Sequence, residues 1–520
     1  MIDEHKKPNL LFMMLDQLRF DAVGINGNGM IKTPNMDKLA STGLNFQSYY
    51  TNAPVCVPSR CTLFTGRYPH SHKVRENHTL LESGREIHLF RILKKEGYTL
   101  GYVGKNHLLQ NEEFANFNYV DIEENHDQSD EELECYAFGR ERLQVMEREG
   151  AWAGASFHPY KEEATAPYVY TSSAINFIEN REKDSPFCLC LSILEPHCPH
   201  IAPDDLEELY QDSEIRIPVS EERELKEKAR RYYIKYLAQH SEKATEEDKR
   251  KFISVYYSMV TLVDRQVGRI MDALHRNGLY QNTVVVLCSD HGDFLFDHGL
   301  CKKDLVLLDS LLHVPLFISY PERLQPQVID ETFMEEVDVL PTLLDIMGVE
   351  TPFGVQGKSI LPYISGERDS HKTEVFAEIC PPWLYNPFET YEEFANYWLD
   401  LGRSQVSLNV PGDFNKCIRT QKYKYIWYGT GEDELYDLES DAQESINLAA
   451  VNEYQPIKKE LKMRLLEWNV LSEDPLDAKL IDCLQLQYDH WIGGKKVVER
   501  VTGPYWLEYR FHPEFRLKGR

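Results

Sequence analysis

The chain has 520 residues, of which 42% are apolar and 27% charged, a composition typical of a soluble globular protein. This length exceeds what one hydrophobic core usually supports, so we expect a large domain at residues 1–372 and a smaller one at residues 373–520. The formal net charge of -27 argues against nucleic acid or an anionic membrane surface as a partner, and an anionic substrate would need a locally basic pocket.

Two features of the sequence bear on the compartment of the protein. The apolar run at residues 10–15 is interrupted by Asp16 and is too short for a signal peptide or a membrane span. The 11 cysteines are scattered and odd in number, which favours reduced thiols over a disulfide framework. The sequence therefore predicts a cytoplasmic protein.

Strand and helix patterns alternate through the first domain. Continuous apolar or β-branched runs predict strands at residues 9–15, 98–103, 187–194 and 283–288. Apolar residues at helical spacing predict helices at residues 35–41, 88–96 and 251–276. This alternation is typical of an α/β fold, in which a large, mainly parallel sheet is sandwiched between helices.

Two charged stretches of the first domain are predicted to be peripheral. Residues 112–134 are acidic and lack periodicity, which indicates a loop. Residues 204–251 are dense in Glu, Lys and Arg at helical spacing, which indicates a solvated helical excursion.

The second domain has a different pattern, typical of an α+β subdomain. Antiparallel strands are predicted at residues 374–378, 417–420 and 424–428, and a closing amphipathic helix at residues 457–468. An aromatic-rich stretch at residues 381–401 is either a substrate lid or a packed insertion, and we favour packing. The aromatic, mildly basic tail at residues 488–520 is predicted to dock on the same subunit or on a neighbour, which would make a homo-oligomer.

Polar residues follow four of the predicted strands at the carboxyl end. They are Asp16, Lys105, His197 and Asp290. Ligand sites of open α/β sheets form at these ends, so we expect the four side chains to contribute to one site.

Two of these strand ends carry a pair of candidate metal ligands. Asp16-Gln17 and Asp290-His291 together offer two carboxylates, an amide oxygen and an imidazole. This set suits a divalent cation that keeps coordination positions open. An isolated Asp-His pair is also often structural, and these residues alone leave that alternative open.

The segment Cys56-Val57-Pro58-Ser59-Arg60 is the most informative in the chain. Pro58 suits the first turn of a helix, where a missing N–H costs nothing. Cys56 would then stand at or just before the helix N-terminus, at the positive end of the dipole, with Arg60 about one turn further on. This arrangement predicts an anion site with a modifiable thiol at its mouth, and the alternative is a buried structural thiol.

The segment resembles the Cys-x-Pro-Ser-Arg signature of the type I sulfatases, a family of the alkaline phosphatase superfamily. Three further stretches are similar to motifs of that family: Gly104-Lys105-Asn106-His107, the run from Asp290 to Lys303, and the run from Leu435 to Ala449. The matches follow the family order from residue 9 to about residue 450.

This resemblance implies an alkaline phosphatase-like fold and a sulfuric ester hydrolase that cleaves a sulfate monoester, of a sulfated sugar or an aryl alcohol. Cys56 would be oxidised after translation to formylglycine, whose hydrated aldehyde is the nucleophile. The implied partners are a small anionic sulfate ester and a formylglycine-generating or radical maturase enzyme.

The resemblance also assigns a role to each matching residue. The implied ligands of the divalent cation are Asp16, Gln17, Asp290, His291 and modified Cys56. Arg60 would stabilise the formylglycine, and Lys105 and Lys303 would neutralise the sulfate oxygens. His107 would orient the geminal diol and accept a proton, and His197 would protonate the leaving alcohol. Asn77 would lie near the substrate.

The sequence departs from the family pattern at two of these positions. Most sulfatases have Asp in place of Gln17, and many have Asn in place of His291. This combination resembles phosphonate monoester and phosphodiester hydrolases, which are the alternative function, whereas Lys105 and His107 follow the sulfatase pattern. Ca²⁺ is the family default, and an imidazole ligand also admits Mn²⁺, Mg²⁺ or Zn²⁺.

Structural alternatives remain for several of these residues. The alternative for Lys105 and Lys303 is that they are ordinary surface lysines, and the alternative for His197 is that it only caps a turn. His298 is interpreted as a structural partner of Asp297. Four cysteines are predicted to be core residues: Cys61, Cys188, Cys190 and Cys288. A catalytically silent binding protein is the least favoured hypothesis, because every polar position that the chemistry needs is present.

Overall fold

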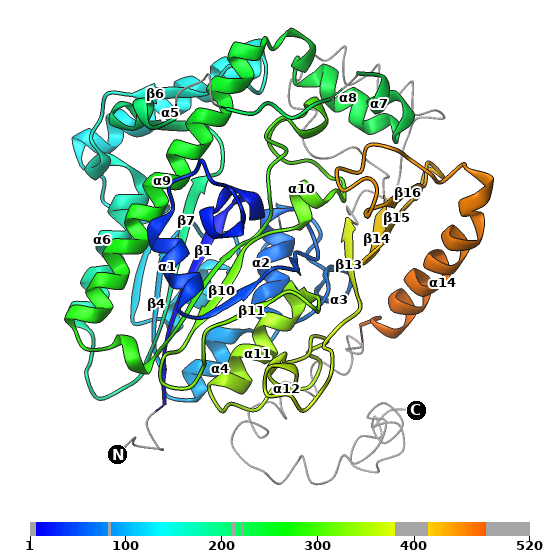
Figure 1. The fold of residues 1–520 in the computed structure, drawn as a ribbon. Coiled ribbons are helices and arrows are strands. Elements are labelled where there is room, and N and C mark those ends of the chain that lie inside the picture. The colour runs from blue at the N-terminus through cyan, green and yellow to red at the C-terminus, as the bar shows by residue number, and fades with distance from the viewer. Residues whose placement is uncertain are drawn as a thin grey trace, which may run out of the picture.

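The structure is a computed structural model that describes residues 7–474, apart from residues 78, 82–84, 211–214, 221 and 380–413 (Figure 1). The aromatic-rich stretch at residues 381–401 and the tail at residues 488–520 lie outside the described residues, so the hypotheses about them stay predictions.

A mixed, mainly parallel sheet of eight strands forms the centre of the first part of the chain, as predicted. In spatial order its strands are β11 (Gln327–Ile329), β2 (Leu44–Phe46), β10 (Leu316–Ser319), β9 (Thr283–Ser289), β1 (Asn9–Asp16), β7 (Phe187–Pro196), β4 (Thr99–Gly104) and β5 (Tyr119–Ile122). The strands from β9 to β5 are all parallel, whereas β10 runs antiparallel to both of its neighbours. The four strands predicted from apolar runs are thus the adjacent strands β9, β1, β7 and β4.

Helices cover both faces of this sheet (Figure 1). One face packs against α1 (Pro34–Ser41), α6 (Ala166–Asn180) and α9 (Glu246–Arg276), and the other against α2 (Cys56–Thr65), α4 (Leu89–Lys95) and α11 (Val339–Ile346). Alternate residues of β1 enter the two cores, so that every residue of the strand is buried. Burial on both faces is why the central strands read as continuous apolar runs in the sequence.

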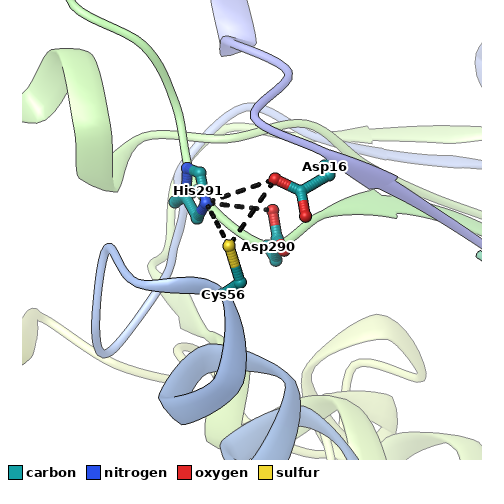
Figure 2. Close-up of side chains that lie close together, drawn as sticks. All are labelled: Asp16, Cys56, Asp290 and His291. Atoms are coloured by element: carbon teal, nitrogen blue, oxygen red, sulfur yellow. Dashed lines mark hydrogen bonds and ion pairs between the residues drawn. The ribbon is translucent and has the colours of Figure 1, made fainter. Parts of the chain in front are cut away.

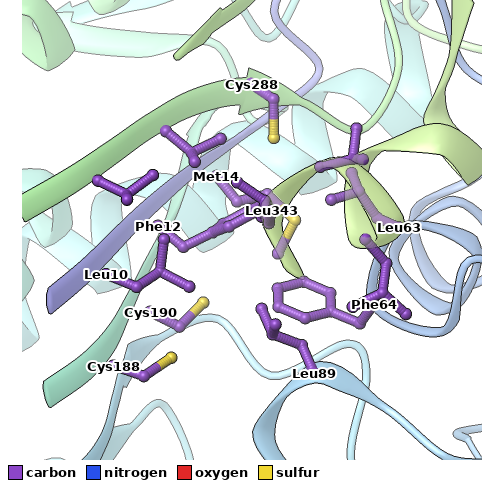
Figure 3. Close-up of a cluster of buried hydrophobic side chains, with 14 of the residues drawn as sticks. Leu10, Phe12, Met14, Leu63, Phe64, Leu89, Cys188, Cys190, Cys288 and Leu343 are labelled. Atoms are coloured by element: carbon purple, nitrogen blue, oxygen red, sulfur yellow. The ribbon is translucent and has the colours of Figure 1, made fainter. Parts of the chain in front are cut away.

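The core beneath α2 fixes the helix that begins at Cys56 (Figure 3). Phe64 of α2 packs on Phe12 of β1 with ring centroids 5.0 Å apart, and Leu63 belongs to the same cluster. Cys61, Cys188, Cys190 and Cys288 are buried in this cluster as well, which confirms the prediction that they are core residues. The nine cysteines among the described residues all carry free thiols.

A second, antiparallel sheet follows residue 373, as predicted. Its strands are β13 (Glu374–Ile379), β14 (Asn415–Thr420), β15 (Tyr423–Tyr428) and β16 (Glu434–Asp437), and α14 (Gln455–Leu471) packs against it. Trp468 of α14 stacks on Phe376 of β13, with ring centroids 4.8 Å apart. Whether these residues form a separate domain from residue 373 stays a prediction.

The prediction of a loop at residues 112–134 is wrong. The segment contains a 3-10 helix (Asn111–Asn116), the edge strand β5 and the start of α5 (Asp130–Glu149). Only Ile122 of β5 is fully buried, because the strand lies at the edge of the sheet. The half-exposed strand therefore lacks the apolar run that identified the central strands.

The prediction of a solvated excursion at residues 204–251 is only partly correct. The segment is helical, with α7 (Glu222–Glu227), α8 (Arg230–Ala238) and the first turn of α9. However, Tyr232 of α8 is fully buried in a core that also contains Leu307, and Arg231 lies buried 3.6 Å from Asp304. The charged side chains of Arg231 and Asp304 are buried as a pair, whereas a high density of charged residues in the sequence predicts exposure to solvent.

The described residues contain no helix that is both long enough and apolar enough to cross a membrane.

Gly104, the last residue of β4, allows the backbone at Lys105 to pack closely against the neighbouring strand β7. Its φ is +93°, and a Cβ at this position would lie 2.1 Å from the carbonyl oxygen of Ser192 in β7. The Lys105 amide donates to that same carbonyl at 2.9 Å. Only glycine permits this close approach of two backbones.

We expect Gly104→Ala to destabilise the protein far more than Gly97→Ala. Gly97 also has a positive φ, of +85°, but a Cβ at this position would have no heavy atom within 4 Å. Gly97→Ala should therefore cost only the strain of the left-handed backbone, about 1–2 kcal/mol. Gly104→Ala adds a backbone clash and should at least double that cost. Urea unfolding of both variants measures the difference, and equal costs would contradict the assigned role of the close approach.

Candidate active site

The carboxyl ends of four adjacent strands deliver the predicted polar residues. Asp16 ends β1, while Lys105, His197 and Asp290 follow β4, β7 and β9 directly. The structure thus brings these residues to one edge of the sheet, as expected for an open α/β fold.

Four side chains form a compact buried cluster at this edge (Figure 2). Ligand atoms of Asp16, Cys56, Asp290 and His291 all lie within 4.8 Å of one another. His291 Nε2 lies 3.3 Å from Cys56 Sγ, 3.4 Å from Asp16 Oδ1 and 3.6 Å from Asp290 Oδ1. These residues come from β1, the start of α2 and the end of β9, so only the fold assembles them.

The donor set fits a divalent cation. His291 Nδ1 lies 2.9 Å from the carbonyl oxygen of Gly292, an acceptor, which leaves the Nε2 lone pair directed at the cluster. Gln17 is fully buried, its amide nitrogen donates to Asp293, and its Oε1 has no hydrogen-bond partner among the described residues. An orphaned amide oxygen, two carboxylates and an imidazole are ligands that Ca²⁺, Mg²⁺ or Mn²⁺ accepts.

Arg60 forms ion pairs with both carboxylates of the cluster. Its Nη2 donates to Asp16 Oδ2 at 2.8 Å and its Nε to Asp290 Oδ2 at 2.9 Å, and all three side chains are fully buried. Nη1 donates to Ser192 Oγ at 2.9 Å. Because both Oδ2 atoms are used here, both Oδ1 atoms remain on the side of Cys56 and His291. The guanidinium therefore fixes the orientation of two candidate metal ligands.

Positive charge surrounds the thiol of Cys56. Lys303 Nζ lies 2.6 Å from Cys56 Sγ, Lys105 Nζ donates to Asp16 Oδ2 at 2.7 Å, and the His107 ring interacts electrostatically with the Cys56 sulfur. Burial raises the pKa of Cys56, but the charges of Lys303 and Lys105 outweigh it and hold this pKa well below its ordinary value. Neither lysine is a surface residue, since both are 4% exposed.

The carboxylate of Asp16 is held ionised by the same charges. Burial and the Cys56 sulfur raise the pKa of Asp16, but Lys105, His197 and Lys303 outweigh them and keep it far below its ordinary value. The cluster therefore presents a carboxylate rather than a carboxylic acid.

The local sequence explains why Cys56 stands at the mouth of α2. The helix begins at Cys56 after Val55, whose backbone is extended, and Pro58 lies in the first turn, as predicted. The amide of Val57 has no acceptor within the helix because it lies in the first turn, and it donates instead to Asn77 Oδ1 at 3.1 Å. Asn77 thus contacts the backbone beside Cys56.

His197 follows β7 directly and interacts electrostatically with the Asp16 carboxylate. Its Nδ1 lies 2.7 Å from the Cys198 carbonyl oxygen, to which it donates. Burial lowers the pKa of His197, but the Cys198 sulfur and the Asp16 carboxylate raise it, and the net pKa is about 9. The ring is therefore protonated at neutral pH and can act as a proton donor.

Glu336 is a buried residue near the site that the sequence did not reveal. It is fully buried, with Ser59 Oγ 2.5 Å from its Oε1 and Thr51 Oγ1 2.9 Å from its Oε2. Ser59 Oγ also lies 2.8 Å from the carbonyl oxygen of Asp290. One hydroxyl proton serves only one of these two acceptors, so the other contact requires a protonated Glu336. Burial raises the pKa of Glu336 well above its ordinary value, which agrees with this assignment.

No signal in the sequence identifies Glu336. It lies in the charged run Glu335-Glu336-Val337-Asp338, whose composition is typical of a surface. The interpretation of His298 as a partner of Asp297 is also wrong: His298 Nδ1 contacts Glu224 Oε1 at 2.5 Å, and Asp297 pairs with Arg19.

A family model described as Sulfatase matches residues 8–349. An arylsulfatase of Clostridium perfringens (strain 13 / Type A) is 27% identical over 489 residues, which cover 86% of this chain and 92% of that protein. An N-acetylglucosamine-6-O-sulfatase of Bacteroides thetaiotaomicron is 27% identical over 89% of this chain and 86% of its own length. The phosphonate monoester hydrolase of Agrobacterium radiobacter has the same fold, with a TM-score of 0.72 at 22% identity over 90% of this chain and 96% of that one.

We expect Glu336→Gln to be nearly as stable as the parent protein at pH 5 and Glu336→Leu to be less stable by about 1–3 kcal/mol. The amide donates to Ser59 and accepts from Thr51 as the carboxylic acid does, whereas leucine leaves both partners unpaired. The pKa of Glu336 is higher in the folded protein than in the unfolded chain. Its contribution to the stability of the folded state is therefore complete below the ordinary carboxyl pKa and is lost as pH rises through the folded-state pKa. Glu336→Gln should therefore gain stability relative to the parent between pH 5 and pH 8 in urea unfolding. An equal loss for both variants at pH 5 would show that Glu336 is ionised.

Proposed function

The chain belongs to the sulfatase family, whose members hydrolyse sulfate esters, and from this premise we propose that its active site is the cluster of Asp16, Cys56, Asp290 and His291. We propose that Cys56 is converted to formylglycine and that a divalent cation binds between these side chains. The observation that carries the proposal is the position of Cys56 Sγ, within 4.8 Å of two carboxylates and an imidazole and 2.6 Å from Lys303.

The residues of the chain bind and orient the anionic sulfate. Lys303 lies beside the Cys56 sulfur and Lys105 beside Asp16, and both would carry positive charge to the sulfate oxygens. Together with Arg60 they make a basic pocket in a chain of net charge -27, the local inversion of charge that an anionic substrate requires. Asp16, Asp290, His291 and Gln17 would hold the cation, which supplies Lewis-acid stabilisation of the sulfate oxygens when bound.

Two histidines would move the protons. The hydrated aldehyde of formylglycine would supply the nucleophilic hydroxyl, and His107, which interacts electrostatically with side chain 56, would orient it and accept its proton. His197 is protonated at neutral pH and donates to the leaving oxygen. Burial of the cluster and of both lysines excludes water and strengthens the electrostatic interactions in the site, while His107 and His197 are partly exposed.

Maturation of Cys56 requires an external enzyme, and burial limits when that enzyme acts. Cys56 is 1% exposed and lies beneath the surface of the folded chain. A formylglycine-generating or radical maturase enzyme would therefore reach the segment at residues 56–60 before the chain folds around it.

Ca²⁺ is the ion that we propose for the site. Its ligands would be mostly oxygen atoms from Asp16, Asp290 and Gln17, which suits a hard cation. The imidazole of His291 keeps Mn²⁺, Mg²⁺ and Zn²⁺ as alternatives.

A phosphonate monoester or phosphodiester hydrolase is the second candidate function. Gln17 and His291 in the metal set favour it, since these residues distinguish the site from the common sulfatase pattern. Relative kcat/KM for para-nitrophenyl sulfate and para-nitrophenyl phenylphosphonate decides between the two. We expect sulfate to be preferred, because Lys105 and His107 contribute two groups to sulfate binding and proton transfer.

Protein produced with a formylglycine-generating enzyme should lose about 18 Da at residue 56 relative to cysteine, as measured by mass spectrometry of the tryptic peptide.

Cys56→Ala should lower hydrolysis of para-nitrophenyl sulfate by about 10⁴-fold or more, because it removes the nucleophile. Cys61→Ala on the same helix is the matched control, since its sulfur packs in the core, and its activity should stay within about threefold. Full activity of Cys56→Ala would refute the proposed nucleophile.

The rate with an alkyl sulfate should fall as pH rises through about 9, because His197 then loses the proton that the alkoxide needs. His197→Asn should lower kcat for an alkyl sulfate by about 10²–10⁴-fold and remove this alkaline limb. Para-nitrophenyl sulfate should be less affected, since its phenolate leaves without a proton. Persistence of the same alkaline limb in His197→Asn would assign it to another group.

A further inference from the structure

The loop at residues 293–303, here called the Lys303 loop, brings Lys303 to the active site in a backbone conformation that its own residues disfavour. Four of its residues other than glycine have a positive φ, and they are Leu295, Phe296, His298 and Lys302. A left-handed backbone is strained in residues that carry a Cβ. Contacts with other parts of the protein must therefore hold the Lys303 loop in this conformation.

The side chain of Gln239 forms two hydrogen bonds with one residue of this loop. Its Nε2 donates to the carbonyl oxygen of Cys301 at 2.6 Å, and its Oε1 accepts from the amide of Cys301 at 3.0 Å. Both residues are buried, since Gln239 is 2% exposed and Cys301 is 0% exposed. A buried backbone amide and carbonyl need partners, and Gln239 supplies both at a position two residues before Lys303.

Gln239 is held in turn by an element that is fixed to the second sheet. It directly follows α8, which lies above β15 and β16 in Figure 1. The hydroxyl oxygens of Tyr232 in α8 and Tyr428 in β15 lie 3.1 Å apart. The amide of Ala229, just before α8, donates to Glu434 Oε1 of β16 at 2.9 Å. The helix therefore connects the C-terminal sheet to the Lys303 loop.

The position of the Lys303 ammonium depends on where this loop places the backbone. Lys303 Nζ lies 2.6 Å from Cys56 Sγ and 2.8 Å from His291 Nε2. A hydrogen bond from the Phe294 amide to the Lys302 carbonyl oxygen, at 2.8 Å, joins the two arms of the loop just before Lys303. A shift of about 1 Å in a group that acts on the substrate can lower a rate by about 10²-fold. A contact that fixes the backbone at Cys301 therefore bears on the reaction as well as on the fold.

We propose that Gln239 is a positioning residue for Lys303. Its amide fixes the backbone of Cys301 and thereby the distance from Lys303 Nζ to side chain 56. The inference rests on the proposed function, in which Lys303 carries positive charge to the sulfate oxygens. It also assigns a function to α8, which belongs to the charged stretch at residues 204–251 that the sequence predicts to be peripheral.

The alternative is that Gln239 only stabilises the fold by pairing two buried backbone groups. The two interpretations differ in the activity of each folded and matured molecule. A residue that only stabilises the fold changes the amount of active protein, whereas a positioning residue changes kcat and KM after normalisation to the formylglycine content.

The test measures kcat and KM for para-nitrophenyl sulfate, normalised to the formylglycine content of the folded protein by mass spectrometry. Gln239→Met is similar in size but forms neither hydrogen bond, and it should lower kcat about tenfold to hundredfold. Lys303→Ala should lose more, and Gln239→Met should divide its loss between kcat and KM in the same proportion as Lys303→Ala. In the Lys303→Ala background, Gln239→Met should lower kcat by less than about twofold, because no ammonium remains to be positioned.

Gln266→Met is the matched control. Gln266 of α9 is also fully buried, and its amide nitrogen donates to Glu162 Oε1 at 2.7 Å and to the Leu262 carbonyl oxygen at 3.2 Å. This variant should lower the urea midpoint of unfolding, as Gln239→Met does, but leave the normalised kcat and KM unchanged. Gln239→Asn is one methylene too short to reach both groups of Cys301, so it should show the same kinetic pattern as Gln239→Met while keeping a polar side chain.

A crystal structure of Gln239→Met should show Lys303 Nζ displaced from side chain 56 by about 1 Å or more. An undisplaced ammonium, unchanged normalised kinetics in both Gln239→Met and Gln239→Asn, or losses that multiply in the double variant with Lys303→Ala would each overturn this inference. Failure of the parent to hydrolyse any sulfate ester after conversion of Cys56 would instead overturn the proposed function, and the position of Lys303 in the crystal would then decide whether Gln239 fixes it.

Discussion

The whole site depends on the double ion pair that the buried guanidinium of Arg60 makes with Asp16 and Asp290. Without it, two carboxylates from strands β1 and β9 would face each other in a site closed to water, and their repulsion would be severe. With it, each carboxylate gives its Oδ2 to Arg60 and keeps its Oδ1 within reach of His291 Nε2. Arg60 lies one turn into α2, so this helix positions both Cys56 and the guanidinium that orients the two carboxylates.

Charge inside the site is opposite to the charge of the chain. The protein is strongly acidic, yet Lys105, Lys303 and Arg60 are buried around a few atoms of Cys56 and Asp16. Buried cations are stable only when paired, and here the carboxylates that pair with them are also the candidate metal ligands. The same network thus neutralises the buried charges and, in the proposed function, would prepare the site for a cation and an anionic ester.

Sequence patterns predict the parts of the fold that are buried on both faces and the parts of the site that belong to local motifs. The central strands are identifiable from their own apolar runs, and the helix at Cys56 is identifiable from the proline in its first turn. Both signals lie within the segment that they describe. The edge strand β5 is not predicted because most of its residues are only partly buried. The burial of Glu336 is not predicted because it depends on hydrogen bonds with Ser59 and Thr51, which lie more than 270 residues away in the sequence. The pairing of His298 with Glu224 escapes prediction for the same reason. Long-range polar contacts leave no periodic signal in a sequence.

The most direct test of the central claim is the position of a bound ion in a crystal structure of the matured protein grown with Mn²⁺, located by its anomalous scattering. The account predicts a single strong peak at about 2.0–2.4 Å from oxygen atoms of Asp16 and Asp290, from His291 Nε2 and from side chain 56. A peak elsewhere, with Arg60 still paired to both carboxylates and no density between them, would show that these side chains are a structural ion-pair network and not a metal centre.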